Sequence, residues 1–284
     1  MTSILSLPDG IHPDVHNAVY HAKQLGLVSK GALDLVHKSP AHYKAWIDGE
    51  LEDEDTPALM FGRAFHCAIL EPDRFGAEYA FEPQFGDCRF KAAKAARDAW
   101  REENAGRVPL AHEDGVRIQQ MAKKLRAHPL ASRILREGDN EQALLWTDEE
   151  TGLRCRARPD KIIQRLEMIA DLKSCADASP AAFQRDVAKY RYHVQNAHYR
   201  AGCQALGIEI RHFVFVCCEK DPPYNVKCYT VRPASVEYGY ESIRRDMRTM
   251  ATCMKLNDWP GYVEWENDCY TDSIVEVELP AWSE

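Results

Sequence analysis

Two aspartates and a lysine near the middle of the chain have the types and spacing of a metal-dependent hydrolytic site. Asp160 closes a run at residues 152–157 that predicts a strand. Asp171 and Lys173 end a second apolar run that begins at residue 168, and in a strand their side chains project from one face. A tight connection would bring both carboxylates to one point, where they could hold a hard divalent cation. Lys173 would place an ammonium beside that cation, an arrangement suited to phosphodiester hydrolysis.

The same residues could also form an ordinary ion pair on the protein surface. Asp-x-Lys occurs by chance in many chains, and an exposed carboxylate–lysine pair contributes little to stability. The catalytic interpretation therefore depends on the segments that would surround these residues.

A buried helix is predicted at residues 58–70, because Thr56-Pro57 forms a strong helix start and the segment is apolar nearly all round. Gly62 and His66 are four residues apart and share one face of this helix. Since a helical glycine costs about 1 kcal/mol relative to alanine, we expect a strand or the substrate to approach closely at Gly62. His66 could be a hydrogen-bonded core residue or a metal ligand.

A β-hairpin is predicted at residues 141–158, with its turn at residues 148–152. A period of two places Arg154, Arg156 and Arg158 on one face of the second strand, leading towards Asp160. They could bind a phosphate-bearing substrate, with Arg156 the best candidate, or pair with Glu141 and the acids of the turn. Glu141 itself could orient a water at a metal site or only pair with an arginine.

Helices and two further strands are expected around this hairpin. In the helix at residues 90–100, Lys91 and Lys94 lie on one side and could follow a DNA backbone, although a solvated helix face is an equal alternative. The other predicted helices are residues 29–47, broken near Ser39-Pro40, then 111–135, 180–188, 190–206 and 233–256, and the further strands are residues 212–219 and 226–231. Residues 1–28 and 259–284 are expected to be mostly irregular.

The composition is that of a soluble globular protein, with 284 residues, 45% hydrophobic and 28% charged. No segment is long and apolar enough for a membrane span or a signal peptide, so we expect a cytoplasmic protein that does not contact a membrane. The net charge of −8 does not exclude nucleic-acid binding, because a local positive groove can act within an acidic protein. The ten cysteines lack a Cys-x-x-Cys pair and are expected to be reduced thiols, most of them buried.

Four motifs occur in an order that resembles the RecB-type branch of the PD-(D/E)XK nucleases. They are Gly62-x-x-x-His66, Pro159-Asp160, Asp171-x-Lys173 and Gln195-x-x-x-Tyr199. The resemblance implies an α/β fold with a mixed central sheet, flanking helices and added N-terminal helices. It also implies that His66, Asp160, Asp171 and the Leu172 carbonyl bind Mg²⁺ or Mn²⁺, with one or two ions in the site. Lys173 would then position water and offset charge, while Gln195 and Tyr199 would support these ligands or contact DNA.

Longer segments, at residues 39–43, 56–72 and 189–195, look like the exonuclease domain of the RecE-type enzymes, exodeoxyribonuclease VIII. This resemblance implies degradation of one strand of linear double-stranded DNA from its 5′ end, which leaves a 3′ overhang for recombination. It further implies a ring-shaped homo-oligomer, expected to be a tetramer, and a RecT-type single-strand annealing partner. The alternatives are a PD-(D/E)XK endonuclease, a nuclease of other polarity, or an inactive DNA-binding subunit.

We expect one nuclease domain over residues 1–284. Residues 1–140 would form a mainly helical part that carries His66, residues 141–231 the catalytic sheet, and residues 232–284 a C-terminal helix and tail.

Overall fold

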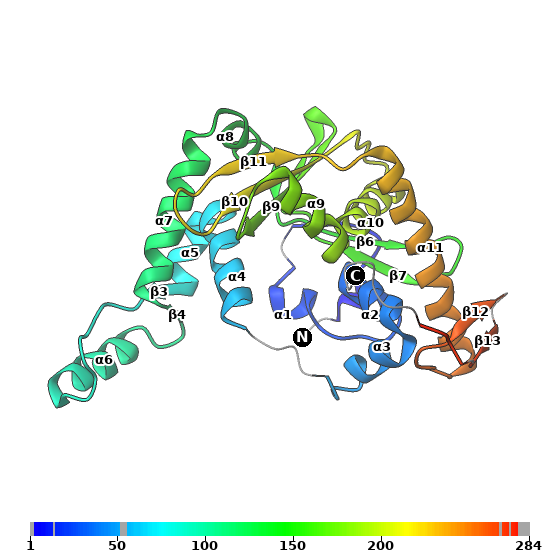
Figure 1. Ribbon diagram of the computed structural model, residues 1–284, viewed down its shortest axis with the longest axis horizontal. Coiled ribbons are helices and arrows are strands. Elements are labelled where there is room, and N and C mark those ends of the chain that lie inside the picture. The colour runs from blue at the N-terminus through cyan, green and yellow to red at the C-terminus, as the bar shows by residue number, and fades with distance from the viewer. Residues whose placement is uncertain (1–2, 14, 52–55, 267–268, 273, 278–284) are drawn as a thin grey trace.

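Two β-sheets form the centre of the fold, and helices cover them (Figure 1). The computed structural model describes residues 3–13, 15–51, 56–266, 269–272 and 274–277. One sheet has the order β11-β10-β9-β8-β5, with β5 at Asp139–Asn140, β8 at Lys161–Ile163, β9 at Met168–Cys175, β10 at His212–Glu219 and β11 at Val226–Tyr229. The other has the order β1-β6-β7-β2, with β1 at Gly10–His12, β2 at Leu27–Val28, β6 at Ala143–Thr147 and β7 at Arg154–Ala157.

Strand β9 lies in the middle of the five-stranded sheet and carries the Asp-x-Lys motif. It pairs with β8 in an antiparallel register that sets Lys161 opposite Ala170. On its other side it pairs with β10 in parallel, with Asp171 opposite Phe215. A parallel pair needs a crossover connection, which α9 (Pro180–Lys189) and α10 (Tyr192–Ala205) provide. The strand extends three residues beyond the apolar run that predicted it, because Lys173 to Cys175 continue the pairing with β10.

Alternate residues of this sheet enter two hydrophobic cores. Ile169 and Phe215 belong to one core, together with residues of α2 (Lys30–Lys38), α3 (Pro40–Ile47), α10 and α11 (Pro233–Leu256). Ala170 and Leu172 belong to the other, with residues of α4 (Pro57–Leu70), α7 (His112–Ala127) and α8 (Pro129–Arg136). A mixed sheet covered by helices in this way is the predicted PD-(D/E)XK type of core, and the fold class is confirmed.

Helix starts agree closely with the capping signals in the sequence. The Thr56 side chain accepts a hydrogen bond from the Leu59 amide at the start of α4. The Ser179 side chain does the same for the Ala182 amide at the start of α9. In both helices a proline follows the cap, where its missing amide proton leaves no donor unsatisfied.

The N-terminal segment differs from the irregular structure expected for residues 1–28. It contains β1, the short helix α1 (Asn17–Tyr20) and β2. Strand β1 pairs with β6 and β2 pairs with β7, so this segment supplies both outer strands of the four-stranded sheet. Strands of two or three residues are too short to show a period of two, which explains why the sequence did not predict them.

An arm extends away from the sheets and carries α6 (Lys91–Glu103) at its far end (Figure 1). The short parallel strands β3 (Tyr79–Phe81) and β4 (Val108–Leu110) form its base, next to α5 (Pro72–Glu78). No residue of α6 is buried. Near the other end of the molecule, β12 (Glu264–Glu266) and β13 (Cys269–Thr271) form a small hairpin.

The described part of the chain bears on the expectations for membrane-spanning helices and for cysteines. None of its helices combines the length and the apolar character that crossing a membrane requires. The nine cysteines whose side chains are described are free thiols, and most of them are buried.

Candidate active site

Asp160 lies immediately before β8, and its carboxylate reaches across to the middle of β9. The backbone amide of Leu172 donates a hydrogen bond of 2.6 Å to Asp160 Oδ2. On the other side, His66 Nδ1 of α4 lies 3.4 Å from the same oxygen. Asp160 therefore connects the sheet to the helix that carries the Gly-x-x-x-His motif.

Glu141 completes a group of three potential metal ligands. His66, Glu141 and Asp160 each offer one ligand atom, and these three atoms lie within 4.8 Å of one another. Strand β5 pairs Asn140 with Lys161, and the Glu141 amide donates to the Asp160 carbonyl at 3.2 Å, which holds the two acids together. Glu141 adopts a left-handed backbone conformation with φ of 51°. The predicted strand start at residue 141 is therefore wrong, since β6 begins at Ala143.

A second group, on the face of β9 that points to α10, contains Asp171, Lys173 and Gln195. Lys173 Nζ lies 2.6 Å from Asp171 Oδ2. The Gln195 amide nitrogen donates to Asp171 Oδ1 at 2.5 Å, and its oxygen accepts from Lys173 Nζ at 3.1 Å. Gln195 thus fixes the carboxylate and the ammonium relative to each other. Asp171 is only 2% exposed, so this arrangement is held inside the protein.

The acidic groups strongly influence one another's protonation. Burial, followed by the charge of Asp160, raises the pKa of Glu141 to about 8. Burial also raises the pKa of Asp171 to about 6, although Lys173 opposes the shift. For Asp160, burial acts in the same direction but is outweighed by His66 and Lys173, so that its pKa is lowered. Asp160 is therefore the carboxylate that stays ionised most readily, while Glu141 tends to hold a proton.

These residues fit a divalent cation. Two carboxylates and an imidazole are donors that Mn²⁺ accepts, while Mg²⁺ favours the oxygen ligands. Asp171 Oδ2 is buried, and the positive charge that faces it among the described residues is the Lys173 ammonium at 2.6 Å. A cation would also offset the burial and the Asp160 charge that together raise the pKa of Glu141.

The remaining motif residues lie around these two groups. Leu172 is fully buried, and its amide contributes the hydrogen bond to Asp160. Tyr199, partly buried on α10, has a pKa raised well above its usual value by burial, and its hydroxyl interacts with Gln195. At Gly62 an added Cβ would meet no atom within 4 Å. The expected close approach of a strand at Gly62 is therefore wrong, and open space remains on that face of α4.

The predicted DNA-binding roles of Arg156 and Arg158 do not agree with the structure. Arg156 is 5% exposed and donates to the carbonyls of Tyr20 and Ala22. Arg158 donates to the Val15 carbonyl and the Asn17 side chain. Both guanidinium groups also lie over the Tyr20 ring, at 5.0 and 3.9 Å from its centroid. They bind the N-terminal segment to the sheet, a role that the alternation of residues alone could not distinguish from phosphate binding.

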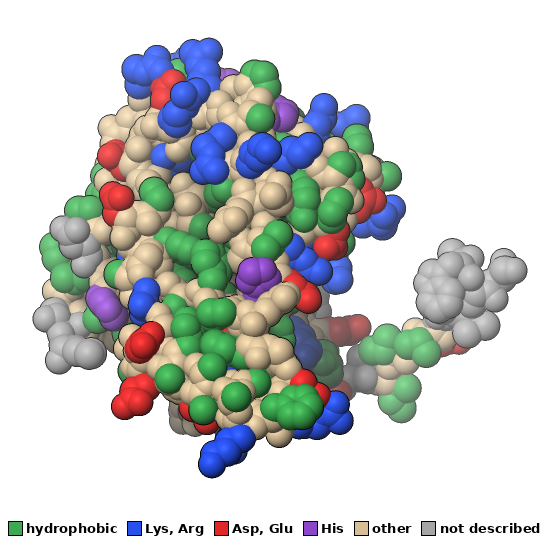
Figure 2. Space-filling model, turned by 90° about the vertical axis from the view of Figure 1, so that its left-hand side faces the viewer, with side chains coloured by type: hydrophobic (Ala, Val, Ile, Leu, Met, Phe, Trp, Pro, Cys, Tyr) green, Lys and Arg blue, Asp and Glu red, His purple; other side chains and the backbone are tan. Residues whose placement is uncertain are grey.

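Other basic residues are exposed. Lys91 and Lys94 lie on α6 of the arm, where their role in DNA binding stays a prediction. Figure 2 shows Lys and Arg side chains gathered on the upper part of the face that α7 and α8 help to form. Exposed basic residues at the end of α7 and on α8 are Lys123, Lys124, Arg126, Arg133 and Arg136. This surface is locally basic in a chain of net charge −8.

The fold, with acidic groups at the β8–β9 pair beside a lysine, defines a PD-(D/E)XK nuclease type of domain. A family model described as a PDDEXK-like domain of unknown function (DUF3799) matches residues 29–271, and the chain belongs to this family. Among solved structures, the chain is similar to one from Eubacterium rectale described as a putative exonuclease, with a TM-score of 0.62. That match covers 95% of this chain and 97% of the other at 14% identity, so it concerns the fold alone. A comparison with curated proteins gave no match.

Proposed function

We propose that this protein is a metal-dependent exonuclease that hydrolyses phosphodiester bonds of linear double-stranded DNA. The observation that carries this proposal is the arrangement of His66, Glu141 and Asp160 as three ligands within 4.8 Å, next to a lysine held by Asp171 and Gln195. This combination provides a site for Mg²⁺ or Mn²⁺ and a fixed positive charge beside it. In a PDDEXK-like nuclease domain, both features serve phosphodiester hydrolysis.

Each residue has a distinct role in the proposed reaction. His66, Glu141 and Asp160 would hold the cation, and Asp171 would hold the same cation or a second one. A bound divalent cation lowers the pKa of a coordinated water and neutralises charge on the phosphate. Lys173 places its ammonium at the scissile phosphate, where it stabilises the negative charge that develops as water attacks phosphorus and the ester oxygen leaves. Gln195 keeps Lys173 oriented, and Tyr199 supports Gln195.

The finer features of the proposal come from the resemblance to the RecE-type enzymes. They are digestion in the 5′ to 3′ direction, a 3′ overhang for recombination, a ring-shaped homo-oligomer and a RecT-type annealing partner. The similar fold of a protein described as a putative exonuclease supports action at DNA ends. Sedimentation of the purified protein tests the ring, since a tetramer would have about four times the 32.4 kDa mass of the chain.

The test of the proposal compares linear and circular duplexes labelled at either 5′ or 3′ ends, with Mg²⁺, Mn²⁺ or EDTA. We expect cation-dependent loss of the 5′ label as short products, an intact circle, and no cleavage by Asp160→Ala. Cleavage of the circle would indicate the endonuclease alternative, and early release of the 3′ label would reverse the polarity. Binding of DNA with no cleavage under any condition would indicate the inactive DNA-binding alternative.

A further inference from the structure

Two stacked tyrosines extend outward from Lys173. The Lys173 ammonium lies over the Tyr192 ring, 4.7 Å from its centroid. Tyr192 stacks on Tyr190 with centroids 5.6 Å apart and an interplanar angle of 26°. The Lys189 ammonium lies 4.9 Å from the centroid of Tyr190. The order outward from the catalytic group is therefore the Lys173 ammonium, the stacked rings of Tyr192 and Tyr190, and the Lys189 ammonium.

The inner ring is fixed by the protein, and the outer ring is open to solvent. Tyr192 stacks on Phe215 of β10, with centroids 5.3 Å apart. Tyr190 is 44% exposed, and Lys189 is exposed beside it. A flat ring could stack on this outer ring if the exposed Lys189 side chain, whose ammonium lies over the ring, moves aside.

The turn between the two tyrosines is strained and firmly held. Arg191 has φ of 52° and ψ of 46°, a left-handed conformation that is unfavourable for a residue with a side chain. Its guanidinium pairs with Asp34 and with Asp246 Oδ2, each at 2.9 Å, and also donates to the Leu33 carbonyl. Lys30 donates to the Tyr190 carbonyl at 2.6 Å. The surroundings thus impose the conformation that stacks Tyr190 on Tyr192.

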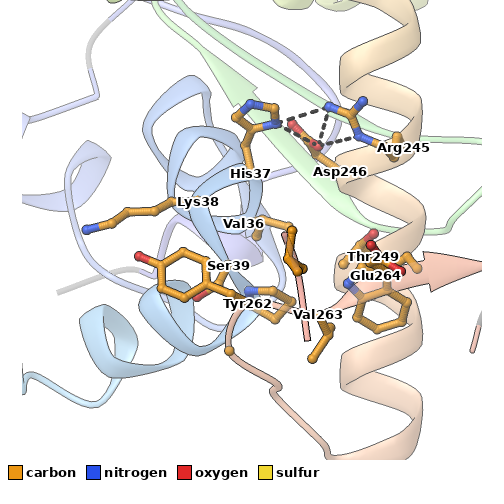
Figure 3. A pocket seen from close by; sticks show the side chains of 14 residues that line it. Val36, His37, Lys38, Ser39, Arg245, Asp246, Thr249, Tyr262, Val263 and Glu264 are labelled. Carbon is orange, nitrogen blue, oxygen red and sulfur yellow. Dashed lines mark hydrogen bonds and ion pairs between the residues drawn. The ribbon is translucent and has the colours of Figure 1, made fainter. Parts of the chain in front are cut away.

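Asp246 connects this turn to a neighbouring cavity of about 350 Å³ between the α2–α3 junction and α11. Its carboxylate is 3% exposed and also faces His37 and Arg245 in the cavity wall (Figure 3). A buried carboxylate shared by the guanidinium groups of Arg191 and Arg245 is a rigid anchor, because losing either of them would leave a buried charge less compensated. The position of Arg191 is consequently well determined.

We propose that Tyr190, supported by Tyr192, is a stacking platform for bases of an unpaired DNA strand that leads to Lys173, an inference that rests on the proposed function. Bases inside a duplex already stack on their neighbours, so a protein ring can stack only on an unpaired base or at a duplex end. Two stacked rings with a cation at each end suit a single strand, which presents both flat bases and phosphates. Lys189 contacts the strand's phosphate, and Arg191 is a positioning residue.

The test measures binding of a 12-nucleotide thymidine oligonucleotide by fluorescence anisotropy in Ca²⁺, and the quenching of 2-aminopurine placed along the same strand. Tyr190→Ala should weaken binding roughly 5-fold or more, the effect of losing one stacked base, and should restore fluorescence at one or two positions. Tyr190→Trp should bind at least as tightly as the wild type. The control is Tyr262→Ala, which removes a tyrosine that is 74% exposed and contacts His42 instead; its binding should be unchanged.

Arg191→Gln tests the positioning role. It should reduce the quenching of 2-aminopurine, and adding Tyr190→Ala to it should produce little further loss of binding, since one change displaces the ring that the other removes. Additive losses would show that Arg191 acts elsewhere.

Unchanged single-strand binding in Tyr190→Ala, or equal losses in Tyr190→Ala and Tyr262→Ala, would overturn the platform even if the protein cleaves DNA. Conversely, Tyr190-dependent binding and quenching in a protein that cleaves no duplex would support the platform and contradict the proposed exonuclease. The two proposals can therefore fail separately.

Discussion

The Leu172 amide and the Asp160 carboxylate are joined by a 2.6 Å hydrogen bond that links the start of β8 to the middle of β9. This bond orients Asp160 Oδ2 towards His66, 3.4 Å away. The main chain of the Asp-x-Lys strand therefore positions the aspartate of the Pro-Asp motif. The two motifs act as one structural unit, although their aspartates are eleven residues apart in the sequence.

Removing Asp160 should abolish cleavage with little effect on stability. Asp160→Ala loses a charged ligand and the hydrogen bond from Leu172, but it also relieves the repulsion between Asp160 and Glu141. We expect at least a hundredfold loss in single-turnover cleavage of linear duplex and a melting temperature within a few degrees of the wild type, and Asp171→Ala should also be inactive. Cleavage within tenfold of the wild type for either variant would contradict the assignment of the metal site.

Glu141→Gln should stabilise the cation-free protein while reducing its activity. The pKa of Glu141 is raised to about 8 from an ordinary value of 4.5, so the folded state favours the neutral form. The cation-free wild type should accordingly lose stability as pH rises from about 4.5 to 8. In EDTA at pH 8, Glu141→Gln should melt several degrees higher than the wild type. Adding Mn²⁺ should raise the melting temperature of the wild type more than that of Glu141→Gln. Equal melting curves in EDTA would show that Glu141 is not crowded by the other acids.

His66 should bind the cation only in its neutral form. Burial lowers the pKa of His66, but the Asp160 carboxylate outweighs this effect and raises the pKa above its usual value. Protons should thus compete with the cation, and Mn²⁺ affinity should fall as pH decreases through the titration of His66. Calorimetric titrations with Mn²⁺ at several pH values test this, with His66→Gln as the comparison. If His66→Gln cuts normally and only melts earlier, His66 is a structural residue.

Lys173 should contribute to the rate of the chemical step more than to binding. An ammonium has no lone pair for a metal, so Lys173→Ala should retain cation binding. It should lower kcat by roughly a hundredfold or more, as expected for losing one preorganised charge. Lys173→Arg should also be slow, because the larger planar group cannot occupy the point fixed by Asp171 and Gln195. Single-turnover rates beside DNA affinity in Ca²⁺ separate the two effects, and an equal loss of rate and affinity would contradict this role.

His198 should make the fold sensitive to mild acid. Burial lowers the pKa of His198 to about 4 from an ordinary value of 6.5, while its Nε2 donates to the Arg156 carbonyl at 2.9 Å. The unfolded chain binds the proton more readily, so the contribution to stability is complete above about pH 6.5 and is lost as pH falls towards 4. The loss should reach about 3 kcal/mol at pH 4. Urea unfolding at pH 7 and 4.5 should show a smaller pH effect in His198→Gln, which keeps a donor and cannot titrate.

Much of the fold was predictable because its signals are local. The sequence predicted helix α11 with the bounds Pro233–Leu256 that the structure has, and the cap at Thr56 marked the start of α4. The β6–β7 hairpin and β10 were also predicted, because short apolar runs bounded by turns or polar residues indicate strands. These features depend on neighbouring residues and need no knowledge of the tertiary structure.

The site was only partly predictable because its assembly is not local. Glu141 was the weaker candidate in the sequence, since nothing near it indicates that β5 pairs with β8 and brings it to Asp160. Arg156 was the best candidate of its row for phosphate binding, with pairing to acidic residues as the alternative. A row of arginines has the same pattern whether it faces solvent or a short segment from the N-terminus. In both cases the deciding partner is far away in the chain.

The N-terminal segment has a practical consequence for defining the boundaries of the folding unit. The family match starts at residue 29, just after β2, yet β1 and β2 form both outer strands of the four-stranded sheet. A recombinant fragment designed from the family boundary would expose the pairing edges of β6 and β7, which favours aggregation. It would also leave the Arg156 guanidinium without the carbonyls of Tyr20 and Ala22. Expression of such a fragment should therefore give insoluble protein. A recombinant protein should keep the whole N-terminal segment, with any affinity tag placed before residue 1.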